Sequence, residues 1–184
     1  MRRSIPALLA FGLALLLAGP VTASGPAPDA STARFEVRFM AGMVDHHEMA
    51  IEMGEICLDK AVHSELVSMC EDVIATQTAE REDLLTWLST WYGVTHVPRM
   101  TPGQERQMDK LMELSGADFE IAFMESLIRH HALAVVRAER CLDQAGHASL
   151  LAMCGDIVEA QSAEISMLQT WLCDWYDRCR GRPA

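Results

Sequence analysis

The sequence is poor in basic residues. Its 184 residues include 15 Lys and Arg against 26 Asp and Glu, so the formal net charge is −11. Proteins that bind nucleic acid or anionic lipid surfaces present clusters of positive charge to the phosphates. The charge balance therefore argues against nucleic acid and anionic membranes as partners, and it is compatible with a protein that collects cations.

The sequence also lacks an apolar run long enough to span a bilayer. The run at 7–18 has about 12 residues, whereas a transmembrane helix needs about 20. Arg2 and Arg3 precede this run and the small residues Val21-Thr22-Ala23 follow it, which is typical of a secretory signal peptide over residues 1–23. A retained membrane anchor is the alternative.

Cleavage after Ala23 predicts a periplasmic or secreted protein with a net charge of −13 and no stable membrane insertion. Residues 24–34 are rich in Gly, Pro, Ala, Ser and Thr, and we expect them to form a disordered leader. The remaining stretch, 35–179, is long enough for one well-buried domain.

Several catalytic patterns are absent from the sequence. It has no CxxC pair, no glycine-rich loop that would hold a phosphate, and no nucleophile placed beside a general base. It has no strand-like alternation of useful length, and no Pro or Gly interrupts residues 64–92. The sequence therefore predicts an all-α protein and gives no support to nucleotide binding or hydrolysis.

What the sequence does contain is an ungapped duplication. Residues 35–92 align with 119–176, and 26 of the 58 positions are identical. Most identical pairs are polar, sulfur-containing or aromatic, whereas packing alone would require only apolar residues of suitable size. The pairs that recur include His46-His47 with His130-His131, Cys57 and Cys70 with Cys141 and Cys154, His63 with His147, and Gln77 and Glu80 with Gln161 and Glu164.

Each copy predicts a helical hairpin. In the first copy, apolar or small residues recur at helical spacing over 36–61 and again over 64–92, with a turn near Val62-His63. Gly93 suits the left-handed position just after a helix end. The same pattern in the second copy predicts helices at 119–144 and 147–177.

The two copies are joined by a crossover at 93–118. In it, Thr101-Pro102 followed by Gln104 predicts the start of a short helix that ends near Ser115-Gly116. Two hairpins joined by a long crossover predict a ferritin-like four-helix bundle in which a pseudo-twofold axis relates repeat 1 (35–92) to repeat 2 (119–176).

Six cysteines in an exported chain predict disulfides. Two cysteines lie 13 residues apart in each copy, and two more occur only in the second copy. Thiolate binding of a soft metal is the alternative. The simplest pairing is Cys57–Cys70, Cys141–Cys154 and Cys173–Cys179.

The expected disulfides set the register of each antiparallel hairpin. If Cys57 faces Cys70, the numbers of facing residues sum to 127, so His47 lies level with Glu80. In the second copy, the same relation sets His131 level with Glu164. All of these positions lie on the apolar faces, as do Gln77 and Gln161. We therefore expect a polar layer across the bundle interior.

This layer has two interpretations. A buried carboxylate without a partner costs several kcal/mol, so such groups are paired or bound to a metal. Imidazoles and carboxylates that converge form a coordination sphere, or the carboxylates orient the histidines from behind. The alternative is a closed His–Glu–Gln network that fixes the bundle register. The predicted metal residues are His46, His47, Glu80, His130, His131 and Glu164, supported by Gln77, Gln161, Met40 and Met43.

The other histidines and the methionines refine this hypothesis. We expect His46 and His130 at the edge of the helix interface or on the surface, and His63 and His147 at turns. Thioether and imidazole ligands together suit copper, especially Cu(I). However, Met43 and Met49 become leucines in the second copy, which favours a His/Glu centre over a methionine store. We expect the recurring Trp and Tyr residues to pack in the core at the bundle end.

These motifs together resemble the family called domain of unknown function 305. The resemblance implies a ferritin-like helical bundle exported in bacteria, and some members of the family resemble copper-binding or copper-resistance proteins of the periplasm. The cysteine pairs and the methionine-poor second copy depart from the family pattern. The matching segments are Phe39-Met40, Met43-Val44-Asp45-His46-His47, Ile74-Ala75-Thr76-Gln77-Thr78-Ala79-Glu80 and, in the second copy, Phe123-Met124, His130-His131 and Gln161-Ser162-Ala163-Glu164.

The sequence thus predicts an exported protein that binds a transition metal, copper first and zinc or iron after, for sequestration, delivery or resistance. A ferritin-like oxidase that uses a redox metal in the same layer is the second hypothesis. A structural or interaction module whose polar layer binds nothing is the third.

Overall fold

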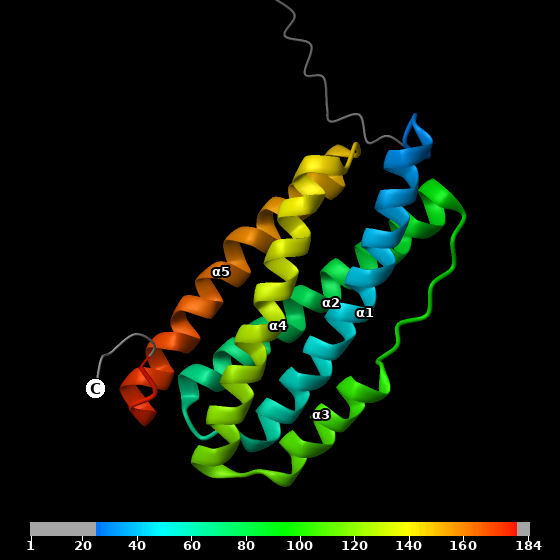
Figure 1. Ribbon diagram of the computed structural model, residues 1–184. Coiled ribbons are helices and arrows are strands. Elements are labelled where there is room, and N and C mark those ends of the chain that lie inside the picture. Colours follow the sequence, from blue (N-terminus) through cyan, green and yellow to red (C-terminus); the bar gives the residue numbers. More distant parts are fainter. Residues whose placement is uncertain (1–24, 180–184) are drawn as a thin grey trace, which may run out of the picture.

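The computed structural model describes residues 25–179 and confirms the all-helical class (Figure 1). The expected signal peptide, 1–23, lies outside the described residues. Within this range the chain forms five helices and no strand, and none of the helices is long and apolar enough to cross a membrane. The helices are α1 (Ala30–Lys60), α2 (Ser64–Tyr92), α3 (Pro102–Glu113), α4 (Gly116–Gln144) and α5 (Ala148–Tyr176).

The first helix begins within the stretch expected to be a disordered leader. Asp29 is the N-cap of α1, and its side chain accepts hydrogen bonds from the main-chain N–H groups of Ser31 and Thr32. An acidic N-cap satisfies N–H groups that have no partner inside the helix. The small polar residues at 29–32 therefore start a helix, and the expectation of a leader was wrong from Ala30 onward.

The remaining helix boundaries follow local signals. Gly93 ends α2 in the left-handed conformation with φ 64°, and its N–H donates to the carbonyl of Ser89. The crossover helix α3 carries a capping box in which the Thr101 side chain accepts from the N–H of Gln104 and the Gln104 side chain accepts from the N–H of Thr101.

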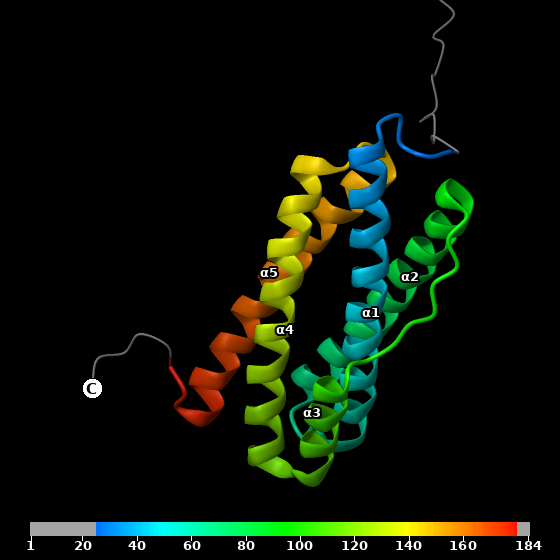
Figure 2. The same cartoon turned by 45° about the vertical axis from the view of Figure 1, so that its right-hand side comes forward.

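The helices form two antiparallel hairpins, α1–α2 and α4–α5, which pack on each other mainly through α1 and α4 (Figures 1 and 2). Helix α4 runs antiparallel to α1, while α2 and α5 lie on the outer sides. The crossover runs along α1, and α3 packs on α1 and α4 near the turn of the first hairpin. The crossing of α1 and α4 therefore lies at the centre of the molecule.

Two apolar clusters lie on opposite sides of this crossing. One surrounds the first hairpin turn and joins the second half of α1 to the first half of α4, with Met53 and Phe123 among its fully buried members. The other surrounds the second hairpin turn and joins the first half of α1 to the second half of α4, with Met40 and Ala138 among its members. The residues between the two clusters form the candidate site.

Each hairpin is closed by a disulfide near its turn. Cys57 is bonded to Cys70 with 6.3 Å between the Cα atoms, and the equivalent bond in the second hairpin joins Cys141 and Cys154 with 6.2 Å between the Cα atoms. A third bond joins Cys173 and Cys179 at the end of α5. These are the pairs expected from the repeat, so within residues 25–179 the chain has no free thiol for a soft metal.

Candidate metal-binding site

Two equivalent histidines, one from each copy, meet where α1 crosses α4. The rings of His46 and His130 are in contact, with 3.5 Å between their centroids and an angle of 33° between their planes. Nε2 of each ring lies 3.1 Å from the main-chain oxygen of the other histidine. The exposed fractions are only 4% and 7%. The expectation that these residues lie at the edge or the surface was wrong, because the crossing helix covers them.

The hydrogen bonds fix the tautomer of both rings. A carbonyl oxygen only accepts, so each Nε2 carries the proton and each Nδ1 keeps a free lone pair. Burial, followed by the charges of neighbouring histidines and Arg137, lowers the pKa of His46 well below 6.5 and lowers the pKa of His130 to about 3. Both imidazoles are therefore neutral at neutral pH. Neither Nδ1 atom has a hydrogen-bond partner among the described residues.

The adjacent histidines lie beside the expected glutamates. Nε2 of His47 is 3.0 Å from Oε2 of Glu80, and Nε2 of His131 is 2.7 Å from Oε2 of Glu164. Both histidine side chains are fully buried, whereas the glutamates are 15% and 19% exposed. The contacts are close, but both Nε2 atoms still count among the buried polar atoms that form no well-directed hydrogen bond. Each His–Glu pair is therefore defined by its short N–O distance and not by a hydrogen bond of good geometry.

The four histidines are neighbours in the order His47, His46, His130, His131, and we call this set the histidine row. The centroid of His46 lies 6.1 Å from that of His47, and the centroid of His130 lies 5.9 Å from that of His131. Among the described residues, no three His, Cys, Asp or Glu side chains are close enough together to hold one metal ion. The structure thus brings the predicted ligands together in pairs. The two imidazoles and two carboxylates expected in the layer do not meet at one point.

The supporting residues from the sequence lie at two different levels. Gln77 and Gln161 are buried about one helical turn before Glu80 and Glu164, and the side-chain oxygen of each has no hydrogen-bond partner in residues 25–179. Met40 and Met43 are fully buried within an apolar cluster. Met49 instead lines a cavity together with His46 and His130, and its sulfur lies 3.2 Å from Nε2 of Gln104. Two methionines line this cavity, Met49 and Met100, and neither is among the supporting residues selected from the sequence.

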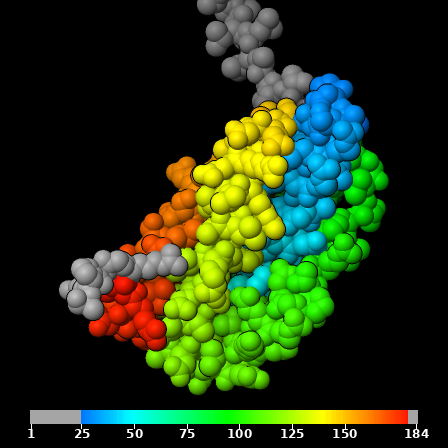
Figure 3. All heavy atoms as spheres, in the orientation of Figure 1, coloured from blue at the N-terminus to red at the C-terminus, as the bar shows by residue number. Residues whose placement is uncertain are grey.

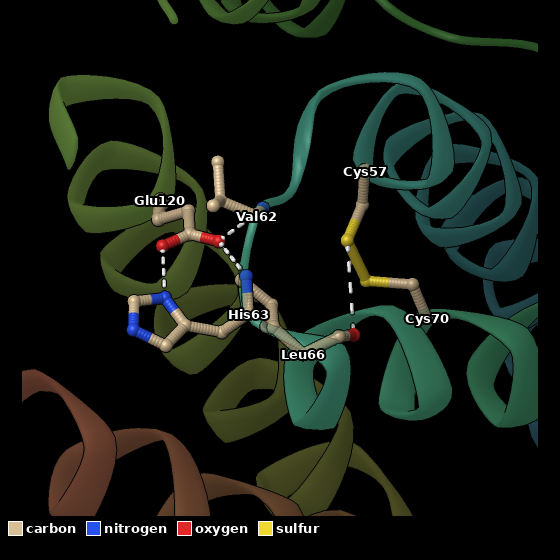
Figure 4. The surroundings of a disulfide bond; sticks show 6 residues. All are labelled: Cys57, Val62, His63, Leu66, Cys70 and Glu120. Carbon is tan, nitrogen blue, oxygen red and sulfur yellow. Dashed lines mark hydrogen bonds and ion pairs between the residues drawn. A yellow bond between two sulfur atoms is a disulfide. The ribbon is translucent and has the colours of Figure 1, made fainter. Parts of the chain in front are cut away.

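The sequence hypothesis also missed two buried glutamates that join the hairpins. Glu120 of α4 accepts hydrogen bonds from the N–H groups of Val62 and His63, at 2.6 and 2.9 Å, and from Nδ1 of His63 at 2.7 Å (Figure 4). The Tyr176 hydroxyl donates to the same carboxylate. Glu120 thereby caps the start of α2 from the opposite hairpin. In the sequence, Glu120 is marked only by its identity with Glu36, the equivalent residue of the first copy.

The equivalent glutamate closes the other end of the molecule. Glu36 accepts from the N–H groups of Gly146 and His147, at 2.7 and 3.1 Å, from Nδ1 of His147 at 2.6 Å, and from the Tyr92 hydroxyl. The ring of His147 also stacks on Trp91 with 4.0 Å between the centroids. The turn histidines therefore bind glutamates in the opposite hairpin through Nδ1, and Nε2 of His147 also lies 2.8 Å from the main-chain oxygen of Gly25.

These contacts shift the pKa values of the carboxyls and phenols. Burial by itself would raise the pKa of Glu36, but hydrogen bonds from Tyr92, Gly146 and His147 outweigh it and lower the pKa. The pKa of Glu120 is lowered in the same way. Burial and the bond to Glu36 raise the pKa of Tyr92 to about 12. Both glutamates are therefore charged acceptors at neutral pH.

Comparison with known proteins identifies the family. The profile described as domain of unknown function (DUF305) matches residues 36–172, so the chain belongs to the DUF305 family. The comparison with curated proteins found no match.

Solved structures of similar proteins include CopM in several metal-bound forms. CopM in the Cu(I)-bound form is 28% identical and has a TM-score of 0.69, over 77% of this chain and 97% of CopM. The Cu(II)-bound form gives 29% identity and a TM-score of 0.70 over the same shares. A DUF305 protein from Streptomyces coelicolor, described as secreted, is 24% identical with a TM-score of 0.67, over 76% of this chain and 91% of that one.

Proposed function

We propose that this member of the DUF305 family is an exported metal-binding protein that sequesters or delivers a transition-metal ion, copper first and zinc or iron after. The proposed ligands are His46, His47, His130 and His131, with Glu80 and Glu164 beside the outer two histidines. Export rests on the expected signal peptide, and the choice of copper draws support from the copper-bound and silver-bound forms of CopM.

One observation carries the proposal. The Nδ1 atoms of all four histidines in the row are buried and have no hydrogen-bond partner among residues 25–179. A buried polar atom without a partner costs about 1–3 kcal/mol, and such atoms are otherwise rare in folded proteins. A bound metal ion would satisfy these lone pairs. The closed His–Glu–Gln network accounts for them less well, because the glutamine oxygens are also unpartnered.

The number and type of ligands favour a soft monovalent ion. Structural zinc is almost always held by four protein ligands. The described residues instead present one histidine–glutamate pair in each hairpin, and no group of three or more possible ligands. Imidazole together with a nearby thioether, such as that of Met49, suits Cu(I). Because His46 and His130 are held neutral by their surroundings, these two rings need not lose a proton before binding.

The proposal is tested by measuring Cu(I) affinity in competition with a chromogenic Cu(I) chelator. We use two double variants, His47→Ala with His131→Ala, and His46→Gln with His130→Gln. Glutamine keeps an N–H donor for the opposing carbonyl while it removes the imidazole lone pair. We expect the Cu(I) affinity to fall about 10- to 100-fold or more. Mutation of residues that only hydrogen-bond to metal ligands already lowers affinity by that factor.

The control is His96→Ala, which removes one imidazole outside the row; His96 binds Asp45 through Nε2 at 2.7 Å. This variant should keep wild-type affinity. Wild-type affinity in both double variants, with folding verified by circular dichroism, would refute the histidine row as the metal site. Turnover with O₂ or peroxide in the copper-loaded or iron-loaded protein would favour the oxidase hypothesis instead.

A further inference from the structure

A cavity of about 550 Å³ opens where α1, α4 and the crossover meet. Figure 3 shows these three segments side by side on one face of the molecule. His46 and His130 form part of the lining, and the rest comes from the crossover and from the outer surfaces of the two helices. Its volume falls within the range of sites that bind small molecules, about 300–1,000 Å³.

Three arginines line this cavity, although the chain as a whole is acidic. They are Arg99 on the crossover and Arg129 and Arg137 on α4, and all three are exposed. Among the described residues, no carboxylate lies within ion-pair distance of any of them. The guanidinium groups therefore keep most of their hydrogen-bonding capacity for a ligand.

The one acidic residue of the lining is already engaged. Asp45 accepts from Nε2 of His96 at 2.7 Å and from the main-chain N–H of Arg99 at 3.2 Å. The lining thus carries three positive side chains against one carboxylate. A guanidinium group has no free lone pair to offer a metal ion, so the metal-binding proposal does not account for these arginines.

The arginines do not belong to the pattern that the two copies share. Arg129 and Arg137 occupy the positions that Asp45 and Met53 occupy in the first copy, and Arg99 belongs to the crossover, which occurs once. The three arginines therefore lie together at one cavity, and the equivalent positions of the first copy carry no positive charge.

We propose that this cavity binds a small, multiply charged oxyanion, either a polycarboxylate or a phosphate. Arginine presents planar, bidentate donors that match both carboxylate and phosphate oxygens. The hydroxyl group of Ser126 and the amide of Gln107 add neutral donors to the lining, and Arg129 already donates to the Ser126 hydroxyl at 3.0 Å. This site does not depend on the metal.

The test is isothermal titration calorimetry on metal-free protein at low ionic strength, with citrate and inorganic phosphate as separate probes. We expect saturable binding of at least one probe with a stoichiometry of one, weakened by added NaCl. Binding of citrate alone assigns a polycarboxylate, and binding of phosphate alone assigns a phosphate. The absence of saturable binding by both probes would overturn the proposal.

Arg129→Gln and Arg137→Gln should each weaken binding about tenfold, since a hydrogen bond to a charged group contributes about that much. The matched control is Arg34→Gln, an exposed arginine of α1 away from the cavity, which should change nothing. Equal weakening by the control would show non-specific attraction and reject the site.

As a second readout, citrate or phosphate should shift the imidazole NMR signals of His46 and His130 but not those of His63 and His147. If the turn signals shift instead, the anion binds elsewhere.

Discussion

Glu36→Ala should destabilise the protein strongly, because this carboxylate holds one hairpin to the other. The Glu36 side chain is fully buried and accepts four hydrogen bonds, three of them from the turn of the second hairpin. Alanine leaves the N–H groups of Gly146 and His147 without an acceptor, and each unsatisfied buried donor costs about 1–3 kcal/mol. With the lost imidazole and phenol contacts, we expect a loss of about 3–5 kcal/mol in the free energy of unfolding.

The assay is urea unfolding at pH 7 under oxidising conditions, followed by circular dichroism. For a chain of this length, about 3–5 kcal/mol also corresponds to a fall in Tm of roughly 10 °C. Glu36→Gln should cost less than the alanine change, because the amide oxygen still accepts from the two N–H groups while the charge is lost. Glu120→Ala should match Glu36→Ala, since Glu120 makes the equivalent contacts.

The control is Glu55→Ala. Glu55 also recurs in the second copy, as Glu139, but it is exposed on α1, so its removal should change stability by less than about 0.5 kcal/mol. The pH dependence gives a second check. The folded-state pKa values of Glu36 and Glu120 are lowered from 4.5, so their contribution is present above pH 4.5 and is lost as the pH falls through the lowered values. Acid sensitivity below pH 4.5 should therefore shrink in Glu36→Gln. If Glu36→Ala costs no more than Glu55→Ala, the carboxylate does not join the hairpins.

Three further predictions concern other parts of the molecule. Replacing Cys57 and Cys70 by serine opens a loop of about 14 residues and should cost about 3 kcal/mol in urea unfolding. A Cβ at Gly54 would lie 2.6 Å from Cγ1 of Ile74, so Gly54→Ala should lower the Tm, and adding Ile74→Val, as in the second copy, should restore it. Because the pKa of His130 is about 3, Cu(I) binding by the His46–His130 pair should vary little between pH 7 and pH 5 in a pH titration of affinity. A steep loss of affinity over that range would point to histidines outside this pair.

The sequence was most informative within each hairpin. A disulfide fixes the register of two antiparallel helices, so His47 could be expected level with Glu80. In the structure, Nε2 of His47 lies 3.0 Å from Oε2 of Glu80. Helix ends were also predictable, because capping residues act over three or four positions of the chain. The leader was misjudged because one residue, Asp29, decides whether a helix starts there.

The sequence was least informative between the hairpins. No covalent bond fixes how α1 crosses α4, so facing residues cannot be found by counting along the chain. Helix-face analysis placed His46 beside the interface, whereas the crossing brings it against its own copy, His130. Glu36 was overlooked for the same reason, since all its partners except Tyr92 lie in the second hairpin.

The reciprocal contacts between the two copies explain which parts of the site recur. A residue that contacts its own copy must be complementary to itself. Histidine satisfies this condition at 46 and 130, because each ring donates one N–H to the other's carbonyl and keeps one lone pair.

The arginine-lined cavity obeys no such condition, because the crossover covers the α1–α4 pair on one face only. Comparison of the two copies therefore reveals the histidine row, in which both halves are constrained alike. It conceals the cavity, which depends on Arg99 of the single crossover and on Arg129 and Arg137, where the copies differ. In a duplicated chain, a site to which both copies contribute equally is found among the residues that are identical in the two copies. A site that both copies do not share is found among the residues that differ between the copies and that face the crossover.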